Sequence, residues 1–275
     1  MFFLNRSRAL RRLCNGILFL SILSLDCRVA GPLLAMLVSA DTPARAAAEQ
    51  PPPLLIVIGF VGGFVRHDNA GHQEVQLAAR LRQHYPTGLE VRIFENHLGG
   101  EARREILRLL DIGHNGTLSG AERLKTHIVL YGHSWGASEV VAMARLLERD
   151  SIPVSLTIQV DSVSKPGQDD KLIPANVAQA INFYQLNGFL HGRRKIVAAD
   201  PLRTEILGNV QLDYKSSPIN CDGYPWYAQI FMKPHIEIES DPGVWDRIES
   251  LIRSKLLPAA LLPAAATQGI TKQFN

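Results

Sequence analysis

The chain has 275 residues, a formal net charge of +3, and 46% hydrophobic residues. This composition is sufficient for a sizeable hydrophobic core and excludes bulk disorder. The small net charge, part of it in arginines near the N-terminus, leaves no clustered basic face, which argues against nucleic-acid binding.

Residues 1–48 are predicted to form a signal peptide or a membrane anchor. Basic residues precede the apolar stretch Ile17 to Leu25, and small-residue cleavage patterns follow at 38–40 and 46–48. An uncleaved anchor is the less favoured alternative because the charged segment 26–28 would be costly in lipid. We therefore expect an exported or membrane-tethered protein, with membrane association through its N-terminus in the second case.

Strand-like and helix-like segments then alternate along a domain that we assign to residues 49–255. Alternation of this kind predicts an α/β fold with a mostly parallel central sheet and helices on both faces. The predicted strands are 54–61, 90–95, 126–131 and 154–160, and the predicted helices are 73–85, 101–110, 137–148 and a last helix that begins after Asp241.

The stretch 163–230 is harder to assign. It contains a helical patch at 175–184, a candidate strand at 209–214 and many turn residues, and it is long enough to carry a lid over a site. Residues 256–275 are rich in Ala, Leu and Pro, and we expect a flexible tail there.

The segment Gly132-His133-Ser134-Trp135-Gly136 joins the strand 126–131 directly to a helix. The backbone two residues before and two residues after such a bend comes close together, which requires glycine at both places. The bend lifts the Ser134 hydroxyl from the sheet edge, and the helix directs its positive end toward it. We predict that Ser134 is a nucleophile.

This strand, turn and helix resemble the nucleophile elbow of the α/β-hydrolase superfamily, and the resemblance extends over roughly residues 53–255. In that superfamily the triad follows the order serine, acid, histidine. His235 lies just before the last helix, where the superfamily places its base, and we expect it on a loop. Asp161 ends the strand 154–160 and is the expected acid, with Asp200 and Asp213 as alternatives.

The resemblance also implies two backbone N–H groups that stabilise an oxyanion. Trp135, the residue after the nucleophile, would supply one of them. The other would come from the loop that follows the first strand, from either Phe60 or Phe64. The histidine that often precedes the Gly-Phe pair in hydrolases is absent from both places.

A second pattern spans 111–122 and resembles a degenerate EF-hand loop. Gly113 replaces an oxygen ligand at the third position, so calcium binding is expected to be weak. The candidate ligands are Asp111, Asn115, Thr117 and Glu122.

Together these features predict a serine hydrolase that cleaves an ester or a lipid acyl bond through Ser134, His235 and Asp161. The chemistry requires no cofactor, and the expected partner is a small-molecule or lipid ester. Amide or thioester cleavage on the same triad remains an alternative because the fold does not separate these reactions. A catalytically silent binding module with the same fold is the other alternative.

Overall fold

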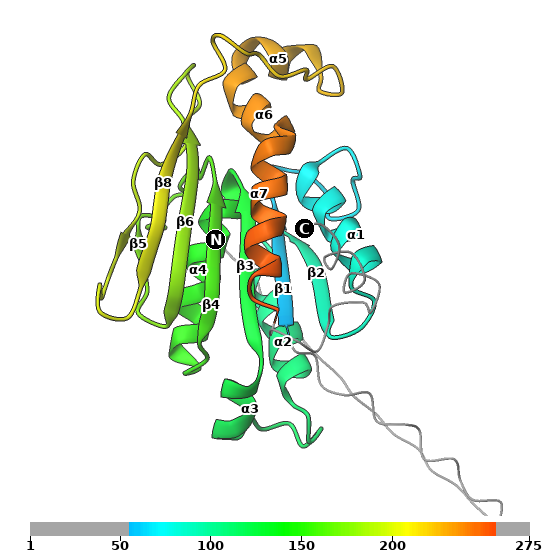
Figure 1. The fold of residues 1–275 in the computed structure, drawn as a ribbon, viewed down its shortest axis with the longest axis vertical. Coiled ribbons are helices and arrows are strands. Elements are labelled where there is room, and N and C mark those ends of the chain that lie inside the picture. Colours follow the sequence, from blue (N-terminus) through cyan, green and yellow to red (C-terminus); the bar gives the residue numbers. More distant parts are fainter. Residues whose placement is uncertain (1–54, 257–275) are drawn as a thin grey trace, which may run out of the picture. The chain divides into compact units, whose positions relative to one another are not determined.

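The computed structural model describes residues 55–256, so the predicted leader, 1–48, and nearly all of the predicted tail lie outside the described residues. The described part contains a six-stranded, fully parallel sheet with the strand order β2-β1-β3-β4-β6-β8 (Figure 1). The fold-class prediction is therefore confirmed. The strands are β1 Leu55–Val61, β2 Leu89–Glu95, β3 His127–His133, β4 Val154–Val160, β6 Val177–Gln185 and β8 Glu205–Leu212, and a separate two-stranded sheet pairs β5 Leu172–Ile173 with β7 Val197–Ala198.

Helices cover both faces of the six-stranded sheet. Residues of α1 and α7 belong to the hydrophobic cluster on one face, and residues of α2 and α4 belong to the cluster on the other. Two further helices, α5 and α6, lie beyond the carboxyl ends of the strands (Figure 1). The helices are α1 Gln73–His84, α2 Gly99–Leu110, α3 Gly120–Lys125, α4 Trp135–Arg149, α5 Trp226–Phe231, α6 Lys233–Ser240 and α7 Pro242–Arg253. None of those within residues 55–256 combines the length and hydrophobicity that crossing a bilayer requires.

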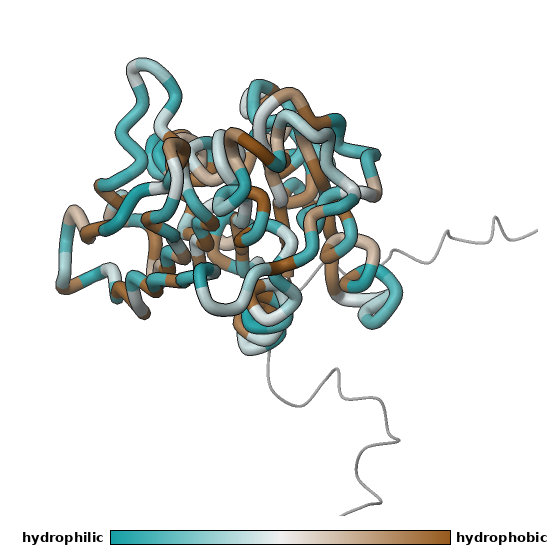
Figure 2. The backbone as a smooth tube through the Cα atoms, turned by 90° about the horizontal axis from the view of Figure 1, so that it is seen from above, coloured by the Kyte–Doolittle hydropathy of each residue, from teal (hydrophilic) through white to brown (hydrophobic). Residues whose placement is uncertain are grey.

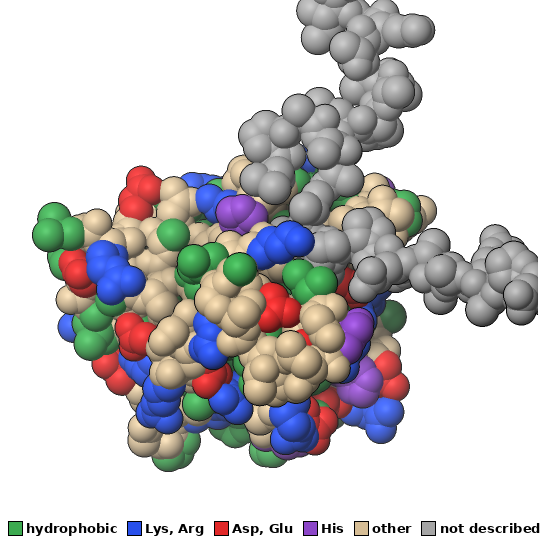
Figure 3. Space-filling view, turned by 90° about the horizontal axis from the view of Figure 1, so that it is seen from below, with side chains coloured by type: hydrophobic (Ala, Val, Ile, Leu, Met, Phe, Trp, Pro, Cys, Tyr) green, Lys and Arg blue, Asp and Glu red, His purple; other side chains and the backbone are tan. Residues whose placement is uncertain are grey.

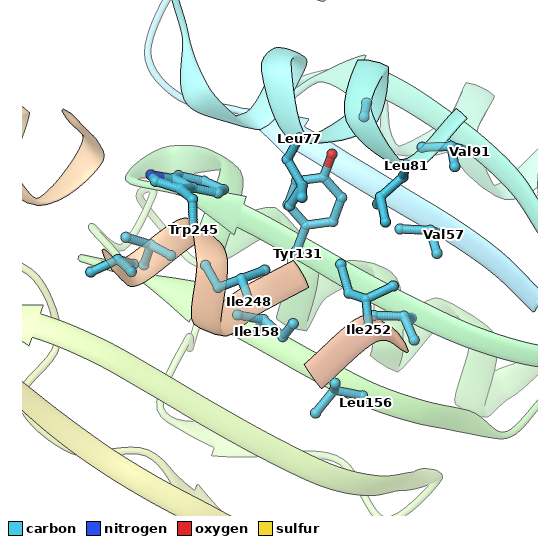
Figure 4. Packing of buried hydrophobic residues seen from close by; sticks show 14 of the residues in the cluster. Val57, Leu77, Leu81, Val91, Tyr131, Leu156, Ile158, Trp245, Ile248 and Ile252 are labelled. Carbon is cyan, nitrogen blue, oxygen red and sulfur yellow. The ribbon is translucent and has the colours of Figure 1, made fainter. Parts of the chain in front are cut away.

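Tyr131 of β3 lies at the centre of the packing between the sheet, α1 and α7 (Figure 4). Its ring meets Trp245 edge-on, with 6.4 Å between ring centroids. Its buried hydroxyl donates to the carbonyl oxygen of Glu74 at 2.8 Å, which satisfies a polar group that would otherwise be costly to bury. The start of α1 is thereby tied to the strand that leads into the Ser134 turn.

The predicted helical patch at 175–184 is wrong, because this segment is the strand β6. Ala180 faces the cluster under α4, whereas the neighbouring Ile181 faces the opposite cluster, and this alternation is characteristic of a strand. Pairing with β4 on one side and β8 on the other overrides the helix preference of its alanines. Much of the predicted lid region therefore extends the sheet, and α5 is the part that lies beyond the strand ends.

The surface of the described residues carries both charged and large hydrophobic side chains. Seen from above, the chain has hydrophobic segments in its interior and hydrophilic loops around them (Figure 2). The face seen from below carries intermixed acidic and basic side chains (Figure 3). Large exposed hydrophobic side chains occur in loops and helices that follow the carboxyl ends of strands of the six-stranded sheet, at Phe64, Phe189, Trp226, Tyr227, Ile230 and Phe231, and also elsewhere, at Leu124, Leu172 and Leu202.

Candidate active site

Ser134 occupies a strained turn between β3 and α4. Its backbone has φ 57° and ψ −124°, a conformation that non-glycine residues rarely adopt. A Cβ on Gly132 would lie 2.6 Å from the carbonyl carbon of Gly136, and a Cβ on Gly136 would lie 2.2 Å from the carbonyl oxygen of Phe60. Gly132 is therefore required for the turn to close, as the sequence pattern predicts, and Gly136 is required because the turn packs against the backbone of β1.

His235 and Asp161 form a buried pair at the same end of the sheet. The imidazole Nδ1 lies 2.6 Å from Asp161 Oδ2, and the exposed fractions of the two residues are 4% and 0%. His235 lies in the first turn of α6, so its predicted loop position is wrong. Pro234 suits the start of a helix, which places the imidazole on a rigid element.

The carboxylate of Asp161 accepts hydrogen bonds from three further donors. Oδ1 accepts from the backbone N–H of Gln185 at 3.2 Å and from that of Gly192 at 2.7 Å, while Oδ2 accepts from Gln185 Nε2 at 2.8 Å. These donors hold the acid in one orientation toward His235. The alternative acids lie elsewhere: Asp200 accepts from the N–H of Leu202, and Asp213 is exposed and bonded to Asn187.

Ser134 and His235 line one cavity of about 510 Å³. Most of its wall is apolar and includes Val163, Leu190 and Met232. No direct hydrogen bond joins the Ser134 hydroxyl to His235 among the described residues, and such bonds are often long before substrate binds. The cavity can thus receive an apolar group beside a hydroxyl and an imidazole.

The turn 62–64 forms part of the cavity wall next to Ser134. A Cβ on Gly62 would lie 3.1 Å from Ser134 Cβ, so this backbone closely approaches that side chain. Phe64 and Trp135 both line the cavity, and their rings meet edge-on at 5.5 Å. Phe60, the alternative oxyanion donor, lies fully buried within β1 and does not line the cavity, so its position does not suit that role.

Asn96 is a site residue that the sequence analysis missed. Its side-chain amide donates to the carbonyl oxygen of Gly63 at 2.5 Å and to that of Val61 at 3.3 Å. It therefore holds two carbonyl groups of the turn 61–63 in place beside the cavity. A single Asn after a predicted strand has no distinguishing local pattern, so the sequence could not have revealed it.

The structure thus combines a parallel sheet, a serine on a strained strand-to-helix turn, and a buried Asp-His pair. The described residues form an α/β fold with these side chains at one end of its parallel sheet. No protein-family profile and no curated protein sequence matches the chain.

Similar solved structures include human thioesterase 2, with a TM-score of 0.38 and 10% identity over 74% of this chain and 96% of that one. RedJ, a thioesterase from the prodiginine biosynthetic pathway in Streptomyces coelicolor, has a TM-score of 0.36 and 12% identity over 79% and 99%. An acetyl xylan esterase has a TM-score of 0.35 and 12% identity over 74% and 99%. At such low identities these likenesses concern the fold alone.

The same cavity is also lined by members of a second group of ionisable side chains that the sequence analysis did not anticipate. The ring of His133 lies 4.5 Å from that of His235, and its Nδ1 lies 3.3 Å from Glu239 Oε2. Burial lowers the pKa of His133 to about 4, so this imidazole is neutral at pH 7. Glu239 also contacts His72, whose Nδ1 lies 2.5 Å from Oε1.

Burial and the neighbouring Glu239 raise the pKa of Glu74, which is completely buried. Burial alone would also raise the pKa of Glu239, but its attraction to His133 and its hydrogen bond with His72 lower it. The two carboxyl groups thus differ in their tendency to ionise, although they lie close together.

The predicted calcium loop connects α2 to α3. Asp111 accepts hydrogen bonds from the N–H groups of Asn115 at 3.1 Å and Gly116 at 2.8 Å, while Asn115 Oδ1 accepts from the hydroxyl of Thr117 at 2.8 Å. Glu122 caps α3, and hydrogen bonds from Ser119 lower its pKa to about 2. The candidate ligand oxygens are therefore engaged within the loop itself, and calcium binding there remains a prediction.

Proposed function

We propose that the protein is a serine hydrolase that cleaves carboxylic esters with an apolar acyl or alkyl group. The observation that carries this proposal is the 2.6 Å contact between His235 and Asp161 beside a cavity that contains Ser134 on its strained turn. A hydroxyl becomes an effective nucleophile when a base removes its proton and a third group orients that base.

In the proposed reaction, Ser134 Oγ attacks the ester carbonyl carbon while His235 Nε2 accepts the hydroxyl proton. Asp161 accepts the hydrogen bond from Nδ1, which directs the unprotonated Nε2 toward the cavity and stabilises the imidazolium that forms. His235 then donates the proton to the departing alcohol. Water repeats the sequence on the acyl-enzyme and releases the acid.

The negative charge of the tetrahedral intermediate requires donors that are already in place. We propose the backbone N–H groups of Trp135 and Phe64, since both residues line the cavity. Among the described residues, neither N–H has an acceptor in a turn or loop hydrogen bond. The amino end of α4 points its dipole toward the same position, which adds to the stabilisation.

The preference for an apolar ester follows from the surroundings of Ser134. Hydrophobic side chains make up most of the cavity wall, and Trp226, Ile230 and Phe231 are exposed on α5, whose residue Ala228 lines the same cavity. A lipid ester would contact this apolar surface with its chains while its carbonyl group reaches Ser134. Export or membrane tethering through 1–48 would be consistent with such a substrate.

Labelling with a fluorophosphonate probe tests the nucleophile directly. The wild-type protein should be labelled and Ser134→Ala should not. Ser138→Ala is the matched control. Ser138 is a buried serine in α4, the helix that directly follows Ser134, and its hydroxyl already forms a hydrogen bond with Gln168. Labelling that persists in Ser134→Ala, or its absence from the wild type, would contradict the proposal and favour a silent binding module.

The alternative reactions on the same triad require a separate comparison. Matched ester, thioester and amide substrates with one acyl group would show which bond is cleaved fastest, and p-nitrophenyl esters of rising chain length would define the acyl preference. We expect the ester to be the best of the three bonds and a hexanoate ester to be cleaved faster than an acetate ester. A preference for the thioester would replace the ester assignment while leaving the triad intact.

A further inference from the structure

Three side chains of types that can bind metal ions meet at the cavity. Two of them are close together in the sequence, and the third comes from a distant part of the chain. His72 precedes α1, Glu74 lies in its first turn, and Glu239 lies near the end of α6. One ligand atom from each lies within 4.8 Å of the other two. His133 faces the same carboxylates, with Nδ1 at 3.3 Å from Glu239 Oε2 and 3.9 Å from Glu74 Oε1.

Among residues 55–256, no cationic side chain pairs closely with the carboxyl group of Glu74. It is completely buried, and neither of its oxygens makes a hydrogen bond of good geometry there, although the N–H groups of Glu74 and Gly62 and the carboxyl group of Glu239 lie near enough to affect its pKa. Within residues 55–256, no lysine or arginine forms an ion pair with Glu74 or Glu239; their basic neighbours are His72 and His133, and Tyr224 also hydrogen-bonds to Glu239. An unpaired acidic group at such a position is costly unless a cation or a proton compensates it.

We propose that His72, Glu74, Glu239 and His133 bind a divalent transition metal ion of the zinc class. Zinc prefers four ligands at about 2.0–2.2 Å in tetrahedral geometry, which places ligand atoms about 3.4 Å from one another. The distances from His133 to the two carboxylates are close to this spacing. His72 and Glu239 are closer, at 2.5 Å, and would move apart by about 1 Å when the ion enters.

The donor set favours zinc over calcium. Two imidazole nitrogens with two carboxylates suit zinc and related ions, whereas calcium takes six to eight oxygen ligands. The ligand backbones are also held in place, because Tyr131 donates to the carbonyl oxygen of Glu74 and Trp245 Nε1 donates to that of Glu239 at 2.5 Å. His72, His133 and Glu239 line the cavity, which provides a path for the ion.

Binding of the ion would join three elements that the triad depends on. It would connect the first turn of α1, the Ser134 turn through His133, and α6, which carries His235. The metal is therefore expected to stabilise the fold around Ser134, His235 and Asp161. Zinc binding and ester cleavage can accordingly be tested apart from each other.

The test uses full-length protein stripped with EDTA and carrying Ser134→Ala, so that its outcome does not depend on the proposed activity. Titration with zinc chloride in a calorimeter should show one site, and elemental analysis after desalting should give one zinc per chain. Glu74→Gln and His72→Gln should each weaken binding at least about tenfold. Zinc should raise the melting temperature of the parent protein by more than that of either variant.

Glu95→Gln is the matched control, because Glu95 contacts His67 at 2.8 Å in another His-Glu pair, outside the cluster. It should leave zinc affinity unchanged. His72 is only partly buried, so His72→Gln keeps the test decisive if Glu74→Gln does not fold. The proposal is overturned if the parent takes up no zinc, or if both variants bind zinc as tightly as the parent does. In that case, a higher melting temperature of Glu74→Gln than of the parent in EDTA would indicate that the carboxyl groups of Glu74 and Glu239 share a proton.

Discussion

Asp161→Asn is expected to abolish most activity while leaving the shape of the site unchanged. Four N–H donors converge on the two carboxylate oxygens: two backbone groups on Oδ1, and Gln185 Nε2 together with His235 Nδ1 on Oδ2. The backbone donors cannot turn away, so the amide oxygen of the introduced asparagine would have to occupy the Oδ1 position. The amide NH₂ would then face His235.

An NH₂ group beside Nδ1 requires the imidazole to accept there and to carry its proton on Nε2. That tautomer cannot take a proton from Ser134. The kcat should fall by about 10⁴-fold, the size expected when the orienting acid of a serine triad becomes an amide, which corresponds to about 5 kcal/mol of barrier. The lost charge-assisted hydrogen bonds should also reduce the free energy of unfolding by about 2 kcal/mol.

The assay is steady-state hydrolysis of a p-nitrophenyl ester, with urea denaturation on the same preparations. Asp213→Asn is the control, because this carboxylate is exposed and bonded to Asn187, and it should retain wild-type kcat. A variant Asp161→Asn that keeps more than a tenth of wild-type kcat would refute the reasoning. A large loss in Asp213→Asn instead would transfer the role of the acid to that residue.

Three further changes test the turn, the buried imidazole and the cavity. Gly136→Ala would place its Cβ 2.2 Å from the Phe60 carbonyl oxygen and should lower the free energy of unfolding by about 3 kcal/mol or more. Gly120→Ala is the control, because a Cβ there meets open space and should leave the stability unchanged. Equal urea midpoints for the two variants would contradict this prediction. The pKa of His133 is lowered to about 4, below an unfolded value of about 6.5, so its contribution is present above pH 6.5 and is lost as the pH falls toward 4. The free energy of unfolding of the wild type should therefore fall between pH 7 and pH 4, and His133→Gln, measured in EDTA, should reduce that fall by about 3 kcal/mol. If the variant and the wild type lose the same stability over this range, the result counts against a neutral imidazole. Met232→Trp should narrow the cavity and reduce kcat/KM for a hexanoate ester at least about tenfold more than for an acetate ester, so a uniform loss would show that the acyl chain binds elsewhere.

The first four strands and the helices between them could be predicted because their signals are local. An apolar run such as 54–61 is buried on both faces of a parallel sheet, and Gly132 is required by its close contact with the backbone of Gly136, four residues later. The helix α7 also begins where Asp241 and Pro242 indicate, since the Asp241 side chain accepts from the N–H of Gly243.

The remaining features depend on contacts between distant residues. The strand β6 contains helix-favouring alanines and becomes a strand only because β4 and β8 pair with it. The buried cluster combines His72 and Glu74 with Glu239. More than half of the chain separates Glu239 from the other two residues, and no common motif links them. Calcium binding by 111–122 and the role of the leader stay predictions.

The strained backbone of Ser134 has a consequence for any attempt to make this protein more robust. Glycine adopts φ 57° and ψ −124° far more easily than serine does, so replacing Ser134, the proposed nucleophile, with glycine relieves conformational strain of about 1–3 kcal/mol. A selection for heat resistance alone would thus favour descendants that lack the proposed nucleophile. Laboratory evolution of the protein would need to reward turnover in every round, because endurance and chemistry make opposite demands on one residue.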